Sequence, residues 1–453
     1  MRIHHQLKKS LWLGGACFGL LLASVNAFGS NWLAVQGTEP EGAEQLAKVW
    51  GFVQAQYQHD NSDPNASGGY IPPKLIGPEF DSQSAFNVNR ARIGVRGVAM
   101  PLDQKINYFL LLEMGNNAIT APGDSFAKMT DASVTFNYIK GARVRAGLFK
   151  YPGSEEGLQA IHVFDYINFT WVTGQMMLER FPNRNYTPNI SPQPIPPGVP
   201  LNGFERSVGA FRDVGVQVFD WFNVGKGWEV SYAAMIGNGN GLNFSDNDDN
   251  KDLYFYAAAE KVYGGAGPRR QGLKIFAWSQ NGTRTADLTN NGTYDPEEYD
   301  RDRWGVGAKY LRNGIRITAE YLDGKGMIWQ APHNPSFGLG PGAGNPNAPA
   351  GNGANGKGKG YYIEGGYRFP GTKWELDARY DEYHRMDGDR FEIDFKRTTL
   401  GVQYFFNPRV RAAFNYEFRS ANAPEFGPGA GPNANVDGID DRIGVQITAI
   451  WSQ

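Results

Sequence analysis

Apolar and polar residues alternate along most of this chain, from about residue 48 almost to the C-terminus. In one of the clearest segments, Val410, Ala412, Phe414, Tyr416 and Phe418 alternate with polar or charged residues. Successive side chains of a strand point to opposite faces, so this pattern predicts strands with one apolar face and one polar face. It predicts sixteen strands, at residues 48–58, 86–98, 104–115, 128–138, 142–150, 211–220, 228–237, 252–263, 271–280, 301–312, 314–324, 359–369, 373–384, 394–406, 408–419 and 440–451.

The connections between these strands alternate strictly between short and long. Short connections such as 140–141, 313 and 370–372 carry the Gly, Pro or Asn residues of tight turns. The long connections span 59–85, 116–127, 151–210, 238–251, 281–300, 325–358, 385–393 and 420–439. Outer-membrane barrels combine an even strand number with short periplasmic turns and longer external loops. The chain is therefore predicted to be all-β, a transmembrane antiparallel β-barrel of about 16 strands. A soluble sandwich would share the alternation but does not require this asymmetry.

Two of the long connections have unusual sequences. Loop 151–210 is the longest, and it contains an apolar, aromatic stretch at 161–178 followed by a proline-rich section. A structureless loop of this length is uncommon, and folding into the lumen would bury the apolar stretch. We therefore expect this third loop to fold inward; the alternative is an additional strand at 166–180, which would leave an odd count. Loop 325–358 is rich in Gly, Pro and Asn and is expected to lie at the surface.

The N-terminus has the features of a secretory signal. Arg2, Lys8 and Lys9 precede an apolar run at 11–25, and a small-residue cleavage site ends at Ala27. The run is too short for a stable spanning helix, so we expect a signal peptide at 1–27 and a barrel domain at 28–453. Cys17, the only cysteine, falls inside this signal, and a lipidated cysteine is the less favoured alternative. The mature chain then has no disulfides.

Composition narrows the functional classes. The formal net charge is −2, and it becomes more negative without the three basic residues of the signal, so there is no basic field for nucleic acid. The mean hydropathy of −0.47 is low for a membrane protein. A barrel resolves this conflict because only every second residue of a strand meets lipid. These observations favour the bacterial outer membrane as the location.

Strand parity predicts which charged side chains line the lumen. If Ile93 and Val95 face lipid, the same parity turns five arginines inward: Arg90, Arg92, Arg96, Arg143 and Arg145. Five further basic candidates flank or occupy the longest loop: Lys150, Arg180, Arg184, Arg206 and Arg212. Rings of Arg and Lys favour anions, and Arg binds phosphate or carboxylate through two parallel hydrogen bonds.

Pairing within the wall is the alternative role for inward charges. Other cations on inward parity are Arg303, Lys309, Arg316, Arg368, Arg379, Arg397, Arg409, Arg411 and Arg442. Acids also fall on inward parity, at Glu113, Asp131, Asp213, Glu229, Glu320, Glu364, Glu375, Asp377 and Glu417. We expect such pairs to account for about half of these arginines.

Four segments together resemble a known family: FNVNRARIGVRG at 86–97, RVRAGLFKYP at 143–152, LER at 178–180 and FRDVGV at 211–216. They are similar to the phosphate-selective porin O/P family over essentially the whole mature chain. The resemblance implies a sixteen-stranded, trimeric outer-membrane channel whose third loop folds inward. It also implies arginines along the entry path and lysines near the constriction, which favour anions such as phosphate.

A few residues suggest functions other than an anion channel. A porin of the same fold for sugars or for aromatic or carboxylic acids could use the aromatic stretch 164–171. The carboxylates of Asp246, Asp248, Asp249 and Asp252 form a weak Ca²⁺ candidate without EF-hand spacing. Pairs such as Asp381 with His384, or Ser154 with His162, lack the third group of a catalytic triad, so no enzyme activity is predicted. We expect no cofactor, and as partners outer-membrane lipid, lipopolysaccharide, small anionic solutes and, from the resemblance, two further copies of the chain.

Overall fold

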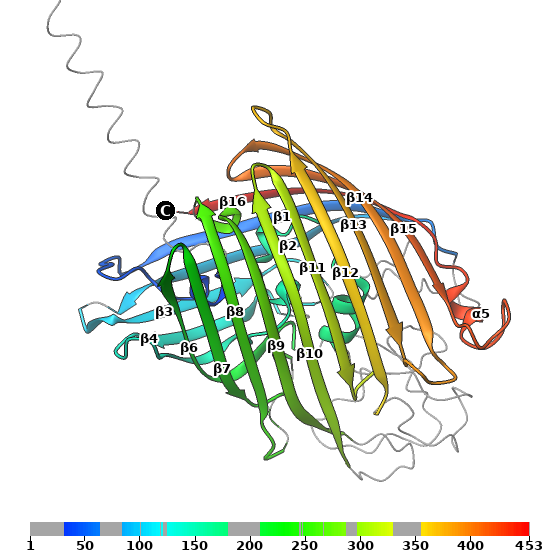
Figure 1. Ribbon diagram of the computed structural model, residues 1–453, viewed down its shortest axis with the longest axis horizontal. Coiled ribbons are helices and arrows are strands. Elements are labelled where there is room, and N and C mark those ends of the chain that lie inside the picture. The colour runs from blue at the N-terminus through cyan, green and yellow to red at the C-terminus, as the bar shows by residue number, and fades with distance from the viewer. Residues whose placement is uncertain are drawn as a thin grey trace, which may run out of the picture.

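The computed structural model describes residues 31–63, 84–99, 101–117, 119–120, 125–179, 209–243, 246, 248–265, 267–286, 297–328 and 355–452. Sixteen strands form one closed antiparallel barrel (Figure 1). They are β1 Lys48–Asp60, β2 Ser84–Ala99, β3 Asp103–Glu113, β4 Lys128–Phe136, β5 Arg143–Lys150, β6 Arg212–Gly225, β7 Trp228–Gly237, β8 Asp252–Gly264, β9 Gln271–Ala286, β10 Glu297–Arg312, β11 Ile315–Lys325, β12 Lys357–Arg368, β13 Trp374–Arg385, β14 Ile393–Asn407, β15 Val410–Asn422 and β16 Arg442–Ser452. The predicted fold class is confirmed, and each predicted range overlaps one strand. The predicted signal peptide and most of loop 325–358 lie outside the described residues.

Each strand pairs with its neighbours in sequence, and the ring closes where β1 pairs with β16. This last register runs from Trp50 opposite Ser452 to Asp60 opposite Arg442. Closure leaves no exposed strand edge, which is required of a sheet surrounded by lipid. The turn between β10 and β11 illustrates the short connections, because Asn313 and Gly314 both have positive φ, at 50° and 84°. An Asn-Gly pair favours that conformation in a two-residue hairpin turn.

The two faces of the barrel differ as the alternation predicts. Ile93 and Leu400 point outward with exposed fractions of 37% and 48%, whereas Arg90 and Arg92 point inward and are each 5% exposed. Side chains on the outer face are largely aliphatic and aromatic, which suits contact with lipid. In the described residues, the helices are all too short or too polar to cross a membrane.

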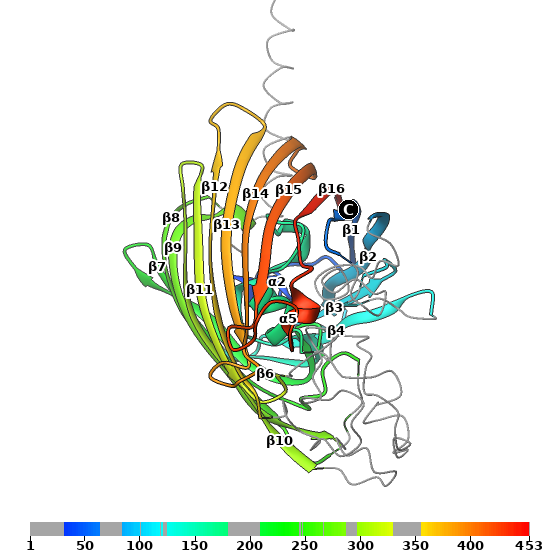
Figure 2. The same cartoon turned by 90° about the vertical axis from the view of Figure 1, so that its right-hand side faces the viewer.

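Residues 151–179 lie inside the ring of strands (Figure 2). They contain α4 Glu155–Leu158, the 3-10 helix η1 Ile161–Val163 and the π-helix η2 Thr173–Met177. Asn168 hydrogen-bonds Gln58 of β1, the Trp171 amide donates to Asp381 of β13, and Lys274 of β9 contacts Glu155. Such contacts reach widely separated parts of the wall. The alternative of an additional strand at 166–180 is wrong, because the described part of that segment contains η2 and no strand.

A second element also lies within the barrel. Helix α2 Trp32–Val35 has Trp32, Leu33 and Ala34 buried, at 3%, 1% and 0% exposure. Trp32 donates a hydrogen bond from Nε1 to the Glu155 carboxylate of α4, at 2.8 Å. Four-residue helices are not stable alone, so α2 depends on these tertiary contacts.

Candidate functional site

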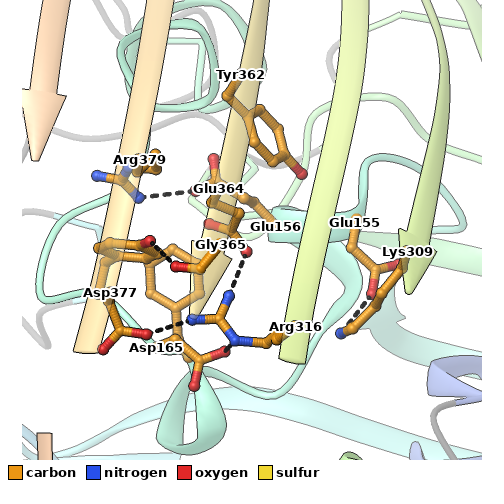
Figure 3. Close-up of polar contacts among 12 residues, drawn as sticks. Glu155, Glu156, Asp165, Lys309, Arg316, Tyr362, Glu364, Gly365, Asp377 and Arg379 are labelled. Atoms are coloured by element: carbon orange, nitrogen blue, oxygen red, sulfur yellow. Dashed lines mark hydrogen bonds and ion pairs between the residues drawn. The ribbon is translucent and has the colours of Figure 1, made fainter. Parts of the chain in front are cut away.

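Residues 151–179 are held to the wall by charged side chains on both sides (Figure 3). In α4, Ser154 caps the helix by accepting a hydrogen bond from the Gly157 amide. The neighbouring Glu155 contacts Lys274 at 2.5 Å and Lys309 at 3.2 Å. Burial opposes ionisation of Glu155, but these two lysines lower its pKa to about 2. Glu155 is therefore a charged anchor for this end of the loop.

The middle of the loop is anchored by two further acids. Glu156 faces Arg379 of β13 at 3.4 Å, and burial raises the pKa of Glu156 above its ordinary value despite that arginine. Asp165 contacts Arg316 at 3.1 Å and Arg269 at 2.9 Å. Arg316 also pairs with carboxylates of β12 and β13, so its charge is compensated several times (Figure 3). These arginines hold the loop and are saturated by protein carboxylates.

The long-loop half of the lumen contains a similar network of paired charges. Glu179 contacts Arg284 and Arg301, and Arg284 also contacts Asp252 at 3.1 Å. Arg397 contacts Asp381 at 2.9 Å and Glu417 at 3.3 Å. The carboxylate of Asp60 contacts Arg419 and Arg442 at 2.7 and 2.8 Å. Wall pairing thus explains most arginines in this half of the barrel.

The short-turn half contains two adjoining cavities that share Trp32, His162, Pro268 and Ile450 in their walls. The smaller cavity, about 290 Å³, lies against β1–β6 and the end of β16. The larger, about 600 Å³, lies against β10–β16. Five cations line the smaller one, Lys48, Arg92, Arg96, Lys150 and Arg212, with the acids Glu39 and Asp131. Seven cations line the larger one, Arg269, Lys309, Arg316, Arg368, Lys373, Arg409 and Arg411, with the single acid Asp165. We refer to these two spaces as the cationic cavities.

Four of the predicted site residues meet at the smaller cationic cavity. Arg92 contacts Glu113 at 2.7 Å, and Arg212 contacts Asp131 at 3.0 Å. Lys150 donates from Nζ to the Gly157 and Gln159 carbonyl oxygens, at 2.8 and 2.6 Å. The fourth, Arg96, contacts the N-terminal segment. Lys150 has no carboxylate partner among the described residues.

The other predicted site residues lie away from the walls of the smaller cavity or outside the described residues. Arg90 donates to Gln54 at 3.1 Å and has no carboxylate partner in the described ranges. Arg145 is fully buried and donates to the Leu33 carbonyl oxygen at 2.9 Å. Arg143 pairs with Asp220 near a short turn, at 3.1 Å, away from both cationic cavities. Three predicted residues lie outside the described part of the chain: Arg180, Arg184 and Arg206.

His162 lies between the two cationic cavities and lines both. Its ring packs against Phe52, with ring centroids 4.9 Å apart. Burial, followed by the positive charges of Arg411 and Arg92, lowers the pKa of His162 to about 3. The imidazole is therefore neutral at ordinary pH and adds no charge to the cavities.

Several lining residues were missed by sequence reasoning. Lys48 and Lys373 sit at strand ends, and the alternation would have placed Lys48 on the inner face of β1. Arg269 belongs to the connection between β8 and β9, where η3 Gly267–Arg269 turns into the lumen and brings Arg269 to Glu375. Trp32 and Glu39 lie before the first strand, where no periodic pattern marked them.

Two groups of polar residues named from the sequence do not converge where the structure describes them. Asp252 turns into the lumen and pairs with Arg284, while Asp246 pairs with Lys251 at the surface, so these two members of the weak Ca²⁺ candidate lie apart. Among described residues, the group with converging metal-ligand atoms is a different one, His384 with Glu392 and Asp394. Asp381 and His384 occupy opposite faces of β13.

The aromatic stretch of the inner loop is used for packing. Phe164, Phe169 and Trp171 are 3%, 5% and 0% exposed. Trp171 packs against Phe395 with ring centroids 5.0 Å apart, and Phe169 against Phe211 at 5.3 Å. These rings form an apolar core inside the barrel and present little surface to a solute.

Comparison with known proteins finds the same family in the second half of the chain. The model of the phosphate-selective porin O and P family matches residues 214–422. No curated protein matches the chain in sequence. Similar solved structures include OmpF of Salmonella typhi in complex with daunomycin, with 16% identity, a TM-score of 0.55, and coverage of 89% of this chain and 97% of that chain. An anion-selective porin from Comamonas acidovorans has 13% identity, a TM-score of 0.51, and coverage of 89% and 99%. At these identities the likeness demonstrates a shared barrel fold.

Proposed function

We propose that the chain is a porin of the bacterial outer membrane, a passive channel that prefers small anions, phosphate or small carboxylates. The observation that carries the preference is the composition of the cationic cavities. Their walls hold twelve Lys and Arg side chains against three acids. Several of these cations share carboxylates of the wall or of the inner loop, whereas Lys150, Arg368, Lys373 and Arg409 have no carboxylate partner among the described residues. Charge of one sign in a narrow, low-dielectric cleft concentrates ions of the opposite sign. The cavities therefore favour anions although the chain as a whole is acidic.

Passage requires sites that bind weakly and repeatedly. Arg92 and Arg212 already share carboxylates, so a solute anion meets them as partly neutralised groups. Lys150, which has no carboxylate partner in the described ranges, lies beside them in the smaller cavity. Exchange among several such cations lets an anion enter and leave, as conduction demands.

The decisive experiment is the reversal potential of single channels in a KCl gradient, repeated with added phosphate. Anion selectivity together with phosphate block of the chloride current supports the proposal, and cation selectivity overturns it. Arg92→Gln and Lys150→Gln should each weaken the block. Arg312→Gln is the matched control, because Arg312 is exposed and stacks on Tyr263, away from both cationic cavities.

A porin for sugars or aromatic acids is the second candidate. It depends on an aromatic surface facing the solute, and the aromatic residues of 164–171 are largely packed. Flux of such a solute that exceeds phosphate flux would favour this candidate. Assembly as a homotrimer in contact with lipid and lipopolysaccharide follows from the family resemblance, and chemical cross-linking in outer-membrane vesicles tests the number of chains.

A further inference from the structure

The chain before β1 enters the barrel through its short-turn end. We call residues 31–39 the N-terminal lumen segment; it comprises Asn31, α2 and the four residues after it. Thr38 is 0% exposed, and Gly37 has φ +88°, a conformation that favours glycine. A Cβ at Gly37 would lie 2.6 Å from the Cβ of Phe109, so this turn is pressed against β3. The Glu39 amide donates to Asn107 at 3.0 Å, which fixes the end of the segment to the wall.

The segment binds two of the arginines that strand parity places in the lumen. Arg96 donates to the Val35 and Thr38 carbonyl oxygens at 2.9 and 2.8 Å, and it forms an ion pair with Glu39. Arg145 donates to the Leu33 carbonyl oxygen at 2.9 Å and to Thr38 Oγ1 at 3.3 Å. All of these acceptors are oxygens. They accept the guanidinium hydrogen bonds that the oxygens of a bound phosphate or carboxylate would otherwise accept.

The same segment lies across the cationic cavities. Trp32, Val35, Gln36 and Glu39 line the smaller cavity, and Trp32 also lines the larger one. On its other side Trp32 contacts Glu155 of the inner loop, and Lys309 lies over its ring at 5.4 Å. The segment thus joins the β2–β5 wall to the inner loop and fills space between them.

We propose that the N-terminal lumen segment is a built-in competitor for anions, which narrows the short-turn entrance and keeps Arg96 and Arg145 occupied. The Glu39 carboxylate is the competing anion at Arg96. Displacement of the segment exposes two guanidinium groups and removes one negative charge from the cavity wall. The competition rests on the proposed anion preference, whereas the narrowing depends only on the position of the segment.

Single-channel recording of three variants tests both parts. Removal of residues 31–39 should raise the single-channel conductance. Glu39→Gln should lower the phosphate concentration for half-block by about tenfold, because a charge-assisted contact no longer competes for Arg96. Glu41→Gln is the matched control, since Glu41 is exposed two residues further along the same connection and lines neither cavity. It should behave as the wild type.

A second measurement guards against misfolding of the deletion variant. Val35→Cys, in a background with Cys17→Ala, should react with a negatively charged thiol reagent in the open channel and change its conductance. Unchanged conductance in the deletion variant and unchanged block in Glu39→Gln would overturn the inference, even if the wild type is anion-selective. A cation-selective wild type whose conductance still rises on deletion would overturn the proposed function and the competition, and would retain the narrowing.

Discussion

The charges at the short-turn mouth offer the sharpest test of where selectivity arises. Arg368, Lys373 and Arg409 line the larger cationic cavity and have no carboxylate partner among the described residues. Arg368 lies over the ring of Phe405 at 4.2 Å, and Lys373 donates to the Phe406 carbonyl oxygen at 3.0 Å. Lys373 and Arg409 are exposed, so their replacement should leave the fold intact. The perturbation is the triple variant Arg368→Gln, Lys373→Gln and Arg409→Gln.

The size of the effect follows from Coulomb's law. A unit charge about 8 Å from an anion in water attracts it by about 0.5 kcal/mol. Screening at 0.15 M salt, where the Debye length is about 8 Å, reduces this to about 0.2 kcal/mol, and at 0.01 M it stays near 0.4 kcal/mol. Three such charges change the local anion concentration by about threefold at 0.15 M and about sevenfold at 0.01 M. The loss of anion selectivity should therefore grow as salt is diluted.

The assay is the reversal potential in KCl gradients at both mean concentrations. The matched control replaces Lys105, Lys140 and Lys226 with Gln, because these lysines are exposed near short turns and line neither cationic cavity. The two triple variants remove the same net charge near the same end of the barrel. Equal reversal potentials in the mouth variant and its control would refute the assignment of selectivity to the cavity.

Three further predictions concern the loop, the histidine and the lipid face. Glu155→Gln breaks a buried contact with two lysines and should cost about 3–5 kcal/mol, measured as a lower denaturant midpoint in detergent, together with stronger anion selectivity. The pKa of His162 is lowered to about 3, so the unfolded chain binds the extra proton and wild-type stability should fall as pH drops from about 6.5 toward 3. In His162→Gln this contribution to the pH dependence should be absent, so the variant should lose less stability than the wild type between pH 7 and pH 4. An equal loss of stability in the two proteins would contradict the reasoning. Leu400→Arg places a charge on the outer face and should destabilise the barrel by about 2–4 kcal/mol in lipid, whereas Leu400→Ala should cost far less.

Strand parity was a reliable guide to the wall because one physical rule governs it. Lipid outside and polar groups inside leave only one register for each strand, so Ile93 exposed and Arg92 buried follow from the sequence alone. The same rule would have corrected the Ca²⁺ candidate. Asp252 is the first residue of β8 and falls on inward parity, which separates it from the surface acids before it.

The contents of the lumen were less accessible to sequence reasoning. The inner loop was expected from its apolar stretch, but α2 has only four residues and no periodicity to mark it. Its place is decided by contacts with Arg96, Arg145 and Glu155, which are 61 or more residues away in sequence. Which inward arginines are paired also depends on neighbours across the ring. Arg379 and Arg397 have partners on other strands or on the inner loop, and parity alone cannot match them.

The distribution of paired and unpaired cations separates two tasks along the lumen. Arginines of the long-loop half share carboxylates that are themselves buried, and removal of one partner there leaves an uncompensated charge in a low-dielectric place. Such pairs suit a rigid frame for the inner loop and offer little to a passing ion. Behind that frame, Lys150, Arg368 and Lys373 keep backbone carbonyl or aromatic contacts, which an anion can replace without leaving a buried acid alone. Ion exchange therefore belongs to the short-turn side of the inner loop, and substitutions on the long-loop side should act first on stability and only through it on conductance.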